Sequence, residues 1–353
     1  MVSRPIKVLI VDDSSVSRDL LAFIIDSDPD LKVIGFAHNG EEAIQFLKHQ
    51  TPDVITMDIV MPKMDGFETT RKLMQLHPIP IIIISNSYKK EDTQKSFMAI
   101  EAGALAILEK PRGPNDPCYP ETAKAIIDSI KLMAEVRVIT RRPYFKPQEQ
   151  AKAVDIKPSQ EVMLLSGIEV VAIGASLGGP QALEVVLSKL PPDFPVPIYI
   201  VQHIASGFIH GLANWLNAAC TLQVKVAKEG EIGQPGYVYL APDKVHMEVR
   251  KGNQVVLIDE PPEGGLRPAV ARLFRSIAES FGPHSIGILL TGMGKDGADD
   301  LLTMKQRGAY TIAQNEETCV IFGMPGEAIK LGAAQRIAPL EEIPQLLCKI
   351  MKK

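Results

Sequence analysis

Long hydrophobic runs, paired cysteines and an excess of basic charge are all absent from this sequence. No apolar run approaches the roughly 20 residues that a membrane-spanning helix needs. The N-terminus runs directly into a strand pattern without the architecture of a signal peptide. A net charge of −4 provides no global field to attract nucleic acid or an anionic membrane. We therefore expect a cytoplasmic protein that neither binds nucleic acid nor inserts into a membrane.

The four cysteines are scattered, and none forms a Cys-x-x-Cys pair. This spacing argues against a zinc site or a disulfide framework and indicates reduced thiols. The hydrophobic share of 46% and the charged share of 23% are those of an ordinary globular protein. With 353 residues, the chain is long enough for two domains with separate cores.

The first part of the chain alternates strand-like and helix-like segments. Such alternation predicts a parallel sheet with helices on both faces. The five expected strands are Lys7–Val11, Val33–Phe36, Val54–Asp58, Ile81–Ser85 and Ala106–Leu108. Helical periodicity is found in segments such as Glu41–Lys48 and Gly66–Gln75, and a final helix is expected at Glu121–Val138. We assign residues 1–125 to a first domain.

A closing helix and a linker are expected over residues 126–166. From Thr140 to Ser166 the chain is polar and slightly basic, with repeated prolines, which is typical of a linker and leaves contact with a partner as an alternative. Alternation resumes in residues 167–353, which we assign to a second α/β domain. His246–Arg250 and Gln254–Asp259, joined at Gly252-Asn253, predict an antiparallel hairpin added to a mostly parallel, doubly wound sheet. Glu341–Met351 is expected to form the last helix.

Charged and polar side chains gather at the expected strand ends of the first domain. Asp12 and Asp13 follow the first strand, Asp58 ends the third, Ser85 ends the fourth and Lys110 follows the fifth. Strand-end caps and surface charges are the plain alternative. A carboxylate cluster of this kind suits Mg²⁺ with retained waters. One carboxylate can also attack a phosphoryl group while the metal and a lysine neutralise the developing charge.

Residues 5–125 resemble a response-regulator receiver domain, which has a five-stranded, flavodoxin-like parallel sheet. The segment Asp58-Ile59-Val60-Met61-Pro62-Lys63-Met64-Asp65-Gly66 carries the resemblance most closely. It implies that Asp58 is the phosphoacceptor and that a histidine kinase is the phosphodonor. It also implies that Asp12, Asp13, Asp58 and the Val60 carbonyl hold Mg²⁺.

The same resemblance implies that Ser85 and Lys110 contact the phosphoryl group. Many receivers have an aromatic switch residue three positions before the lysine, and this chain has Ile107 there. Coupling through a rotating aromatic ring is therefore not expected.

Three residues of the second part of the chain could form a nucleophilic triad. Each lies just past an apolar, strand-like run, where ligands bind in an open α/β sheet. Ser176 follows Ile168–Ile173, His203 follows Ile198–Gln202, and Asp296 lies in the turn after Ile286–Leu290.

Gly174-Ala175-Ser176-Leu177-Gly178 suits a nucleophile elbow, because glycines permit a tight strand-to-helix turn. Pro180 then suits the first turn of a helix over Gln181–Leu190, so Ser176 is expected near a helix N-terminus. A plain glycine turn remains the alternative.

Other interpretations of these motifs fit less well. The order Ser, His, Asp differs from the Ser, acid, His order of familiar α/β-hydrolases. Three further histidines are candidates by type alone: His210, His246 and His284. The Gly292-Met293-Gly294-Lys295-Asp296-Gly297 turn, with Glu316 and Glu317 about 20 residues later, also fits a dinucleotide fingerprint and would indicate a dehydrogenase. It lies too late in the domain for that, and Lys295 is not followed by the Ser or Thr of a P-loop.

The second part of the chain resembles the chemotaxis methylesterase family. The matching stretches are Ile173–Pro180, Val201–His203, Tyr239–Pro242, Arg267–Val270, Leu289–Gly297 and Cys319–Pro325. The resemblance implies that Ser176 is the nucleophile, His203 the general base and Asp296 its orienting acid. It also implies that Met293 contributes a backbone N–H to the oxyanion hole.

That resemblance implies a phosphorylation-activated serine hydrolase. Its expected substrates are glutamate methyl esters of chemoreceptors, which release methanol, and receptor glutamines, which it deamidates. No cofactor is expected in the catalytic domain. The receiver is expected to cover the active site at rest.

Two residues depart from the family pattern. Leu177 follows the nucleophile where a small residue is common, and Ala271 lies where an Asp is frequent, so any contact of that acid is expected to be lost. An always-active enzyme and a catalytically idle docking module remain alternatives.

Overall fold

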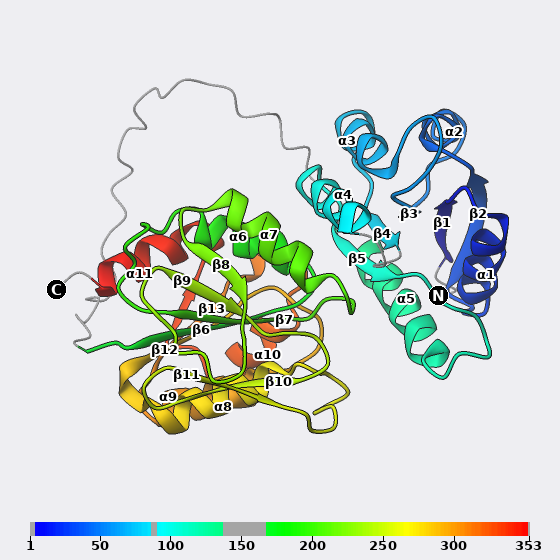
Figure 1. Ribbon diagram of the computed structural model, residues 1–353. Coiled ribbons are helices and arrows are strands. Elements are labelled where there is room, and N and C mark those ends of the chain that lie inside the picture. The colour runs from blue at the N-terminus through cyan, green and yellow to red at the C-terminus, as the bar shows by residue number, and fades with distance from the viewer. Residues whose placement is uncertain (1–3, 86–89, 137–166, 352–353) are drawn as a thin grey trace, which may run out of the picture.

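A computed structural model describes residues 4–85, 90–136 and 167–351, which form two α/β domains (Figure 1). The expected linker from Thr140 to Ser166 lies outside these residues, as do the last positions of the expected helix Glu121–Val138. Over the described ranges, no helix is both long enough and apolar enough to cross a bilayer.

The first domain is a five-stranded parallel sheet in the order β2-β1-β3-β4-β5. Its strands are β1 (Ile6–Val11), β2 (Leu31–Ala37), β3 (Val54–Met57), β4 (Ile81–Ser85) and β5 (Ala106–Glu109). Its helices are α1 (Ser15–Asp26), α2 (Gly40–Phe46), α3 (Gly66–Leu76), α4 (Lys90–Glu101) and α5 (Tyr119–Ala134). All five expected strands are confirmed to within two residues at each end.

Apolar composition explains why this sheet is central. β3 and β4 are buried along their whole length, as expected for parallel strands with helices on both faces. α1 packs with α5, while α2, α3 and α4 pack in sequence with one another. The final helix begins at Tyr119, two residues before the predicted start, because Pro120 is accommodated in its first turn.

The second domain has a seven-stranded, fully parallel sheet in the order β14-β13-β12-β6-β7-β9-β8. Its strands are β6 (Val170–Ala175), β7 (Ile198–Gln202), β8 (Gln223–Val226), β9 (Tyr237–Leu240), β12 (Ser285–Leu289), β13 (Tyr310–Gln314) and β14 (Arg336–Ala338). β6 lies between its successor β7 and the later strand β12, so the strand order reverses at β6.

Helices cover both faces of this sheet (Figure 1). Those on one face are α6 (Gly179–Leu187), α7 (Ile209–Ala219) and α11 (Ile343–Met351), and those on the other are α8 (Val270–Ser280), α9 (Ala298–Gln306) and α10 (Met324–Lys330). The predicted hairpin forms a separate sheet of β10 (His246–Arg250) and β11 (Gln254–Ile258), which packs on α8. The turn predicted at Gly252-Asn253 is present, and both residues adopt the left-handed conformation in it.

The two domains are in direct contact through α4 and the start of β5 on the first domain and α6 and α7 on the second. The rings of Phe97 and Trp215 stack with their centroids 5.9 Å apart. Gln181 Nε2 donates to the Ala104 carbonyl at 2.6 Å. Leu177 packs against the apolar cluster of the first domain. The described chain is therefore in a closed arrangement of the two domains.

Candidate active site and phosphoacceptor pocket

The acidic residues of the first domain meet at the carboxyl edge of its sheet. Strand β1 lies between β2 and β3, so the strand order reverses at β1. Asp12 and Asp13 directly follow β1, and Asp58 directly follows β3. Carboxylate oxygens of the three residues lie within 4.8 Å of one another. The expected acidic cluster is thus formed, with Asp12 and Asp58 buried and Asp13 exposed.

Lys110 lies across two of these carboxylates. Its Nζ is 2.8 Å from Asp12 Oδ2 and 2.8 Å from Asp58 Oδ2. Burial raises the pKa of Asp58 to about 6, although the Lys110 charge opposes that rise. Asp58 Oδ1 accepts a hydrogen bond from the Ile59 N–H at 2.7 Å, which fixes the carboxylate plane. The buried Ser85 lies at the end of neighbouring strand β4, so all five expected polar residues lie at one edge.

The donor set of this pocket fits a hard divalent cation. Three carboxylates within ligand distance of one another are the oxygen donors that Mg²⁺ prefers, and one exposed ligand leaves room for waters. Burial of two acids around a single lysine leaves negative charge that a cation would compensate. Gly66 shapes the same pocket, because a Cβ there would lie 2.1 Å from the Asp58 carbonyl oxygen. Asp65, in the same segment, caps α3 through the Glu68 N–H.

Ser176 lies in a tight turn between β6 and α6. Its N–H donates to the Thr291 carbonyl at 3.0 Å, and its carbonyl accepts from the Gly179 N–H at 2.8 Å. Gly178 has a φ of 75°, the left-handed conformation that glycine adopts without strain. Gly292 approaches so closely that a Cβ there would lie 2.7 Å from the Ser176 Cβ. The expected elbow is therefore formed, next to the N-terminus of α6.

His203 and Asp296 are in contact across the same edge. His203 follows β7, and its Nε2 lies 2.9 Å from Asp296 Oδ2. Because Nε2 faces a carboxylate, it carries the proton, and Nδ1 is the nitrogen left to accept one. The other three histidines do not join this pair: His210 and His284 are exposed, and the buried His246 bonds to backbone groups.

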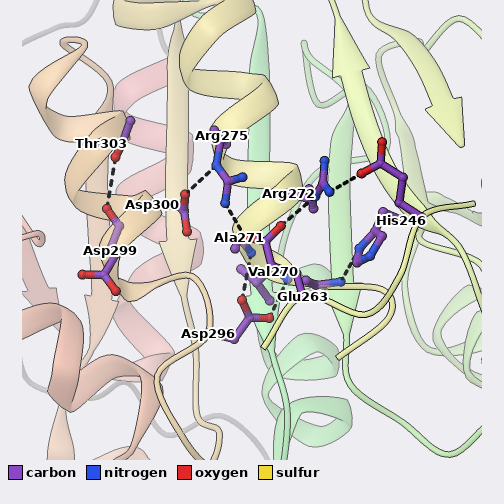
Figure 2. Close-up of polar contacts among 12 residues, drawn as sticks. His246, Glu263, Val270, Ala271, Arg272, Arg275, Asp296, Asp299, Asp300 and Thr303 are labelled. Carbon is purple, nitrogen blue, oxygen red and sulfur yellow. Dashed lines mark hydrogen bonds and ion pairs between the residues drawn. The ribbon is translucent and has the colours of Figure 1, made fainter. Parts of the chain in front are cut away.

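Asp296 also caps a helix that is distant in sequence. The N-cap residue of α8, Ala269, provides no capping side chain. Instead the N–H groups of Val270 and Ala271 donate to the two Asp296 oxygens at 2.7 and 3.0 Å (Figure 2). Burial alone would raise the pKa of Asp296, but the His203 contact and these backbone donors hold that pKa below its ordinary value. The acid is thus kept ionised beside the imidazole.

Ion pairs hold α8 in place behind Asp296 (Figure 2). Arg275 contacts Glu263 and, at 3.1 Å, Asp300 of α9. Arg272 contacts the same Glu263 at 2.6 Å. His246 accepts the Ala269 N–H at 3.2 Å, so one more free donor of the helix start is satisfied. The position of the Asp296 carboxylate is therefore determined by the loop before α8 as well as by its own turn.

Ser176 and His203 line one small cavity of about 20 Å³. The rest of its wall includes residues of the first domain, namely Ile100, Leu105, Ala106 and Ile107. This volume is about that of a single water molecule. In the closed arrangement, residues of the first domain therefore narrow the space beside the half-buried Ser176.

Met293 and Gln202 complete the description of this edge. Met293 is exposed in the turn before Asp296, and among the described residues its N–H has no hydrogen-bond acceptor. Gln202, the last residue of β7, contacts the serine and histidine backbones and was missed by sequence reasoning. The sequence feature that could have indicated Gln202 is its position at the end of an apolar strand, directly before the candidate base His203. The glycine-rich turn 292–297 carries Asp296 to His203, and Glu316 and Glu317 are exposed in a separate short turn.

Comparison with known proteins finds matches over nearly the whole chain. A family model described as CheB methylesterase matches residues 171–347, and one described as response regulator receiver domain matches residues 8–117. The protein-glutamate methylesterase/protein-glutamine glutaminase of Nitrosospira multiformis is 45% identical over 98% of this chain and 97% of its own length. A relative of the same description from Syntrophus aciditrophicus is 47% identical, over 98% of each chain.

One solved structure is similar to the second domain. The CheB methylesterase catalytic domain of Thermotoga maritima is 38% identical, with a TM-score of 0.51, and the match covers 52% of this chain and 99% of that one.

Proposed function

Because this chain belongs to the CheB methylesterase family and carries a receiver domain, we propose that Ser176, His203 and Asp296 hydrolyse glutamate methyl esters of chemoreceptors. The observation that carries this assignment is the cavity shared by Ser176 and His203, with His203 held by an ionised, capped Asp296. The enzyme is a protein-glutamate methylesterase and protein-glutamine glutaminase.

The geometry supports an acyl-enzyme mechanism. His203 Nδ1 takes the proton of the Ser176 hydroxyl as its oxygen attacks the glutamyl γ-carbonyl carbon. The tetrahedral oxyanion is stabilised by backbone donors, among them the Met293 N–H. The imidazolium returns its proton to the leaving methoxide, and methanol departs. Asp296 holds the tautomer and stabilises the imidazolium.

Hydrolysis of the acyl-enzyme follows the same path in reverse. His203 removes a proton from water, the hydroxide attacks the glutamyl ester, and Ser176 leaves with the returned proton. A glutamine side chain forms the same acyl-enzyme with ammonia as the leaving group. The products are therefore a receptor glutamate and either methanol or ammonia.

The receiver domain supplies the regulation. A chemotaxis histidine kinase is the phosphodonor, and the Asp58 carboxylate is the acceptor. Asp12, Asp13 and Asp58 would hold Mg²⁺, which neutralises charge on the transferring phosphoryl group. Lys110 and Ser85 would contact the phosphoryl oxygens, because Lys110 already lies 2.8 Å from Asp58 and Ser85 ends the neighbouring strand.

Release of the receiver is the step that phosphorylation favours. A cavity of about 20 Å³ is too small for a glutamyl methyl ester, and receiver residues form part of its wall. Phosphorylation redistributes charge around Lys110, which directly follows β5. The first residues of β5 line the cavity beside Ser176, so a change at Lys110 can reach that cavity along one strand. Shifting such an equilibrium from 1:99 to 99:1 takes about 5.5 kcal/mol.

The test is methanol release from methylated receptor membranes, with and without a small phosphodonor and Mg²⁺. We expect Ser176→Ala to lower release by about 10⁴-fold or more, and Asp58→Asn to retain basal release but lose all stimulation. Ser188→Ala, an exposed serine at the other end of α6, is the matched control. Release by Ser176→Ala at the wild-type rate would contradict the nucleophile assignment, and stimulation of Asp58→Asn would contradict the acceptor assignment.

A further inference from the structure

Gln202 connects the backbone of Ser176 to that of His203. It is the last residue of β7, pairs with Ala175 of β6, and has only 2% of its surface exposed. Its Nε2 donates to the Ser176 carbonyl at 2.7 Å and to the His203 carbonyl at 2.8 Å. One amide group therefore makes a hydrogen bond to each of the two residues that must exchange a proton.

The orientation of this amide is determined by its neighbours. Both atoms facing Nε2 are carbonyl oxygens, which accept hydrogen bonds and cannot donate them. Rotating the amide by 180° would place Oε1 against two acceptors, so the donor must face them. Oε1 consequently lies in the protein interior, where no described residue donates to it.

That unpaired oxygen carries a cost. A buried acceptor without a donor destabilises a fold. An apolar side chain of similar length would avoid this cost but would leave the His203 carbonyl without the amide donor. Gly179 accommodates the amide, because a Cβ at that position would lie 2.0 Å from Gln202 Oε1. Both the orphan oxygen and the glycine are thus explained by a requirement for the two donor bonds.

The two bonds fix the spacing of the reacting groups. The Ser176 backbone is bonded to Thr291 after β12 and to Gly179 in α6, while the His203 N–H donates to the Ala175 carbonyl at 2.9 Å. Only Gln202 adds a side-chain bond to both carbonyls among the described residues. Displacement of a reacting group by about 1 Å can lower a rate by about 100-fold.

We propose that Gln202 is a positioning residue that sets the distance between the Ser176 hydroxyl and the His203 ring for proton transfer. The proposal rests on the assignment of Ser176 and His203 as nucleophile and base. Gln202 lines the cavity beside Ser176 and His203, but its amide donates to backbone carbonyls rather than to the serine hydroxyl or the imidazole, so it acts through those two carbonyls.

The test compares steady-state ester hydrolysis by the full-length, phosphodonor-treated enzyme and its variants. Gln202→Met keeps the length of the side chain but removes both donors, and we expect kcat to fall by about 10- to 100-fold. KM should change by less than about twofold, because both amide donors face backbone carbonyls and only 2% of the residue is exposed. Gln335→Met is the control, since Gln335 also bonds a strand backbone but lies after α10, away from Ser176.

A double variant separates positioning from loss of folded enzyme. In a His203→Ala background, adding Gln202→Met should change the residual rate by less than about twofold, because residues that act as a unit are not additive. Equal fold losses in both backgrounds would instead indicate a purely structural role and would overturn the proposal.

Gln202→Glu keeps the test decisive if Gln202→Met does not fold. A protonated carboxyl has one donor, so it can serve one carbonyl but not both. We expect a folded variant with kcat below wild type, and wild-type kcat would overturn the proposal. If Ser176→Ala retains activity, the triad itself is wrong. If Ser176→Ala is inactive while Gln202→Met matches wild type, only the positioning role is wrong.

Discussion

The two domains place their candidate functional groups at equivalent points of two different parallel sheets. In the first domain the carboxylates follow β1 and β3, where the strand order reverses. In the second, Ser176 follows β6 and Asp296 follows β12, again where the order reverses. Crevices at such points are where open α/β sheets bind ligands. The difference between the domains lies in how each balances a buried carboxylate.

The receiver balances the charge of its buried carboxylate with a lysine side chain, whereas the catalytic domain uses backbone N–H groups together with His203. Asp58 is balanced by the Lys110 ammonium, and burial still raises its pKa to about 6. Asp296 is bonded by two N–H groups at the start of α8 and by His203, and its pKa is lowered. A flexible lysine can follow a phosphoryl group to a new position, whereas backbone donors hold their acid in one place. The first arrangement suits a switch and the second suits a fixed catalytic geometry.

The largest expected effect comes from neutralising the fixed acid. Asp296→Asn places an amide against both His203 and two backbone donors, so the imidazole tautomer is no longer imposed. We expect kcat for methanol release to fall by about 10³–10⁴-fold. Asp299→Asn, an exposed neighbour in the same loop-to-helix region, is the control and should match wild type. A loss below tenfold for Asp296→Asn would show that catalysis does not depend on this fixed acid, and the contrast with Asp58 would then fail.

The next effect concerns the closed arrangement of the domains. Trp215→Ala removes the ring that stacks on Phe97 of α4. Losing the contact between the buried Phe97 and the half-buried Trp215 weakens docking by about 2 kcal/mol, which corresponds to about 30-fold more of the open form. Release without phosphodonor should rise accordingly, while fully stimulated release should stay at the wild-type level.

Two variants check the origin of that rise. In a Phe97→Ala background, Trp215→Ala should add little, because contacting residues are not additive. Tyr310→Ala removes a half-buried ring of β13 and should leave basal release unchanged. Basal release that does not respond to Trp215→Ala would show that the stacked pair does not hold the domains together.

A smaller effect is expected on stability in acid. The folded pKa of Asp296 lies below its ordinary value, so its stabilising contribution is present at higher pH and is lost as the pH falls through the folded pKa. The free energy of unfolding of wild type should exceed that of Asp296→Asn by about 1–3 kcal/mol near pH 5, and this difference should shrink toward pH 2. Denaturant titrations across this range measure it. A difference that stays constant with pH would mean that Asp296 is not held ionised by its partners.

The strands that end at the candidate site residues could be predicted from the sequence. Short apolar runs bounded by glycine and charge predicted strands that end at or just before Ser176, His203 and Asp58, as the structure has them, because the apolar residues of a buried parallel strand are contiguous in the sequence. It did not identify β8, β9, β13 or β14 as strands. These segments are short or mix polar with apolar residues, as in Gln223–Val226, so their pairing depends on neighbours distant in sequence.

Contacts between residues that lie far apart in the sequence could not be predicted either. Ala271 departs from an acidic family position, yet its N–H, which any residue but proline provides, donates to Asp296. Leu177 likewise departs from a small residue, and it packs against the receiver. Gln202 shows no motif of its own, because its role depends on the spacing of β6 and β7.

The smallest expected effect tests a single hydrogen bond between the domains. Gln181 of α6 donates to the Ala104 carbonyl, while its own Oε1 is buried without a donor among the described residues. Gln181→Ala removes a net contribution of about 1 kcal/mol and preserves the helix, since alanine is the strongest helix former. Basal release should rise by about fivefold with no change in stimulated release, and Gln254→Ala on β11 should change neither. A lower stimulated rate would instead mean that Gln181 supports the catalytic geometry. The hydrogen bond between Gln181 and Ala104 would then not be a purely regulatory contact.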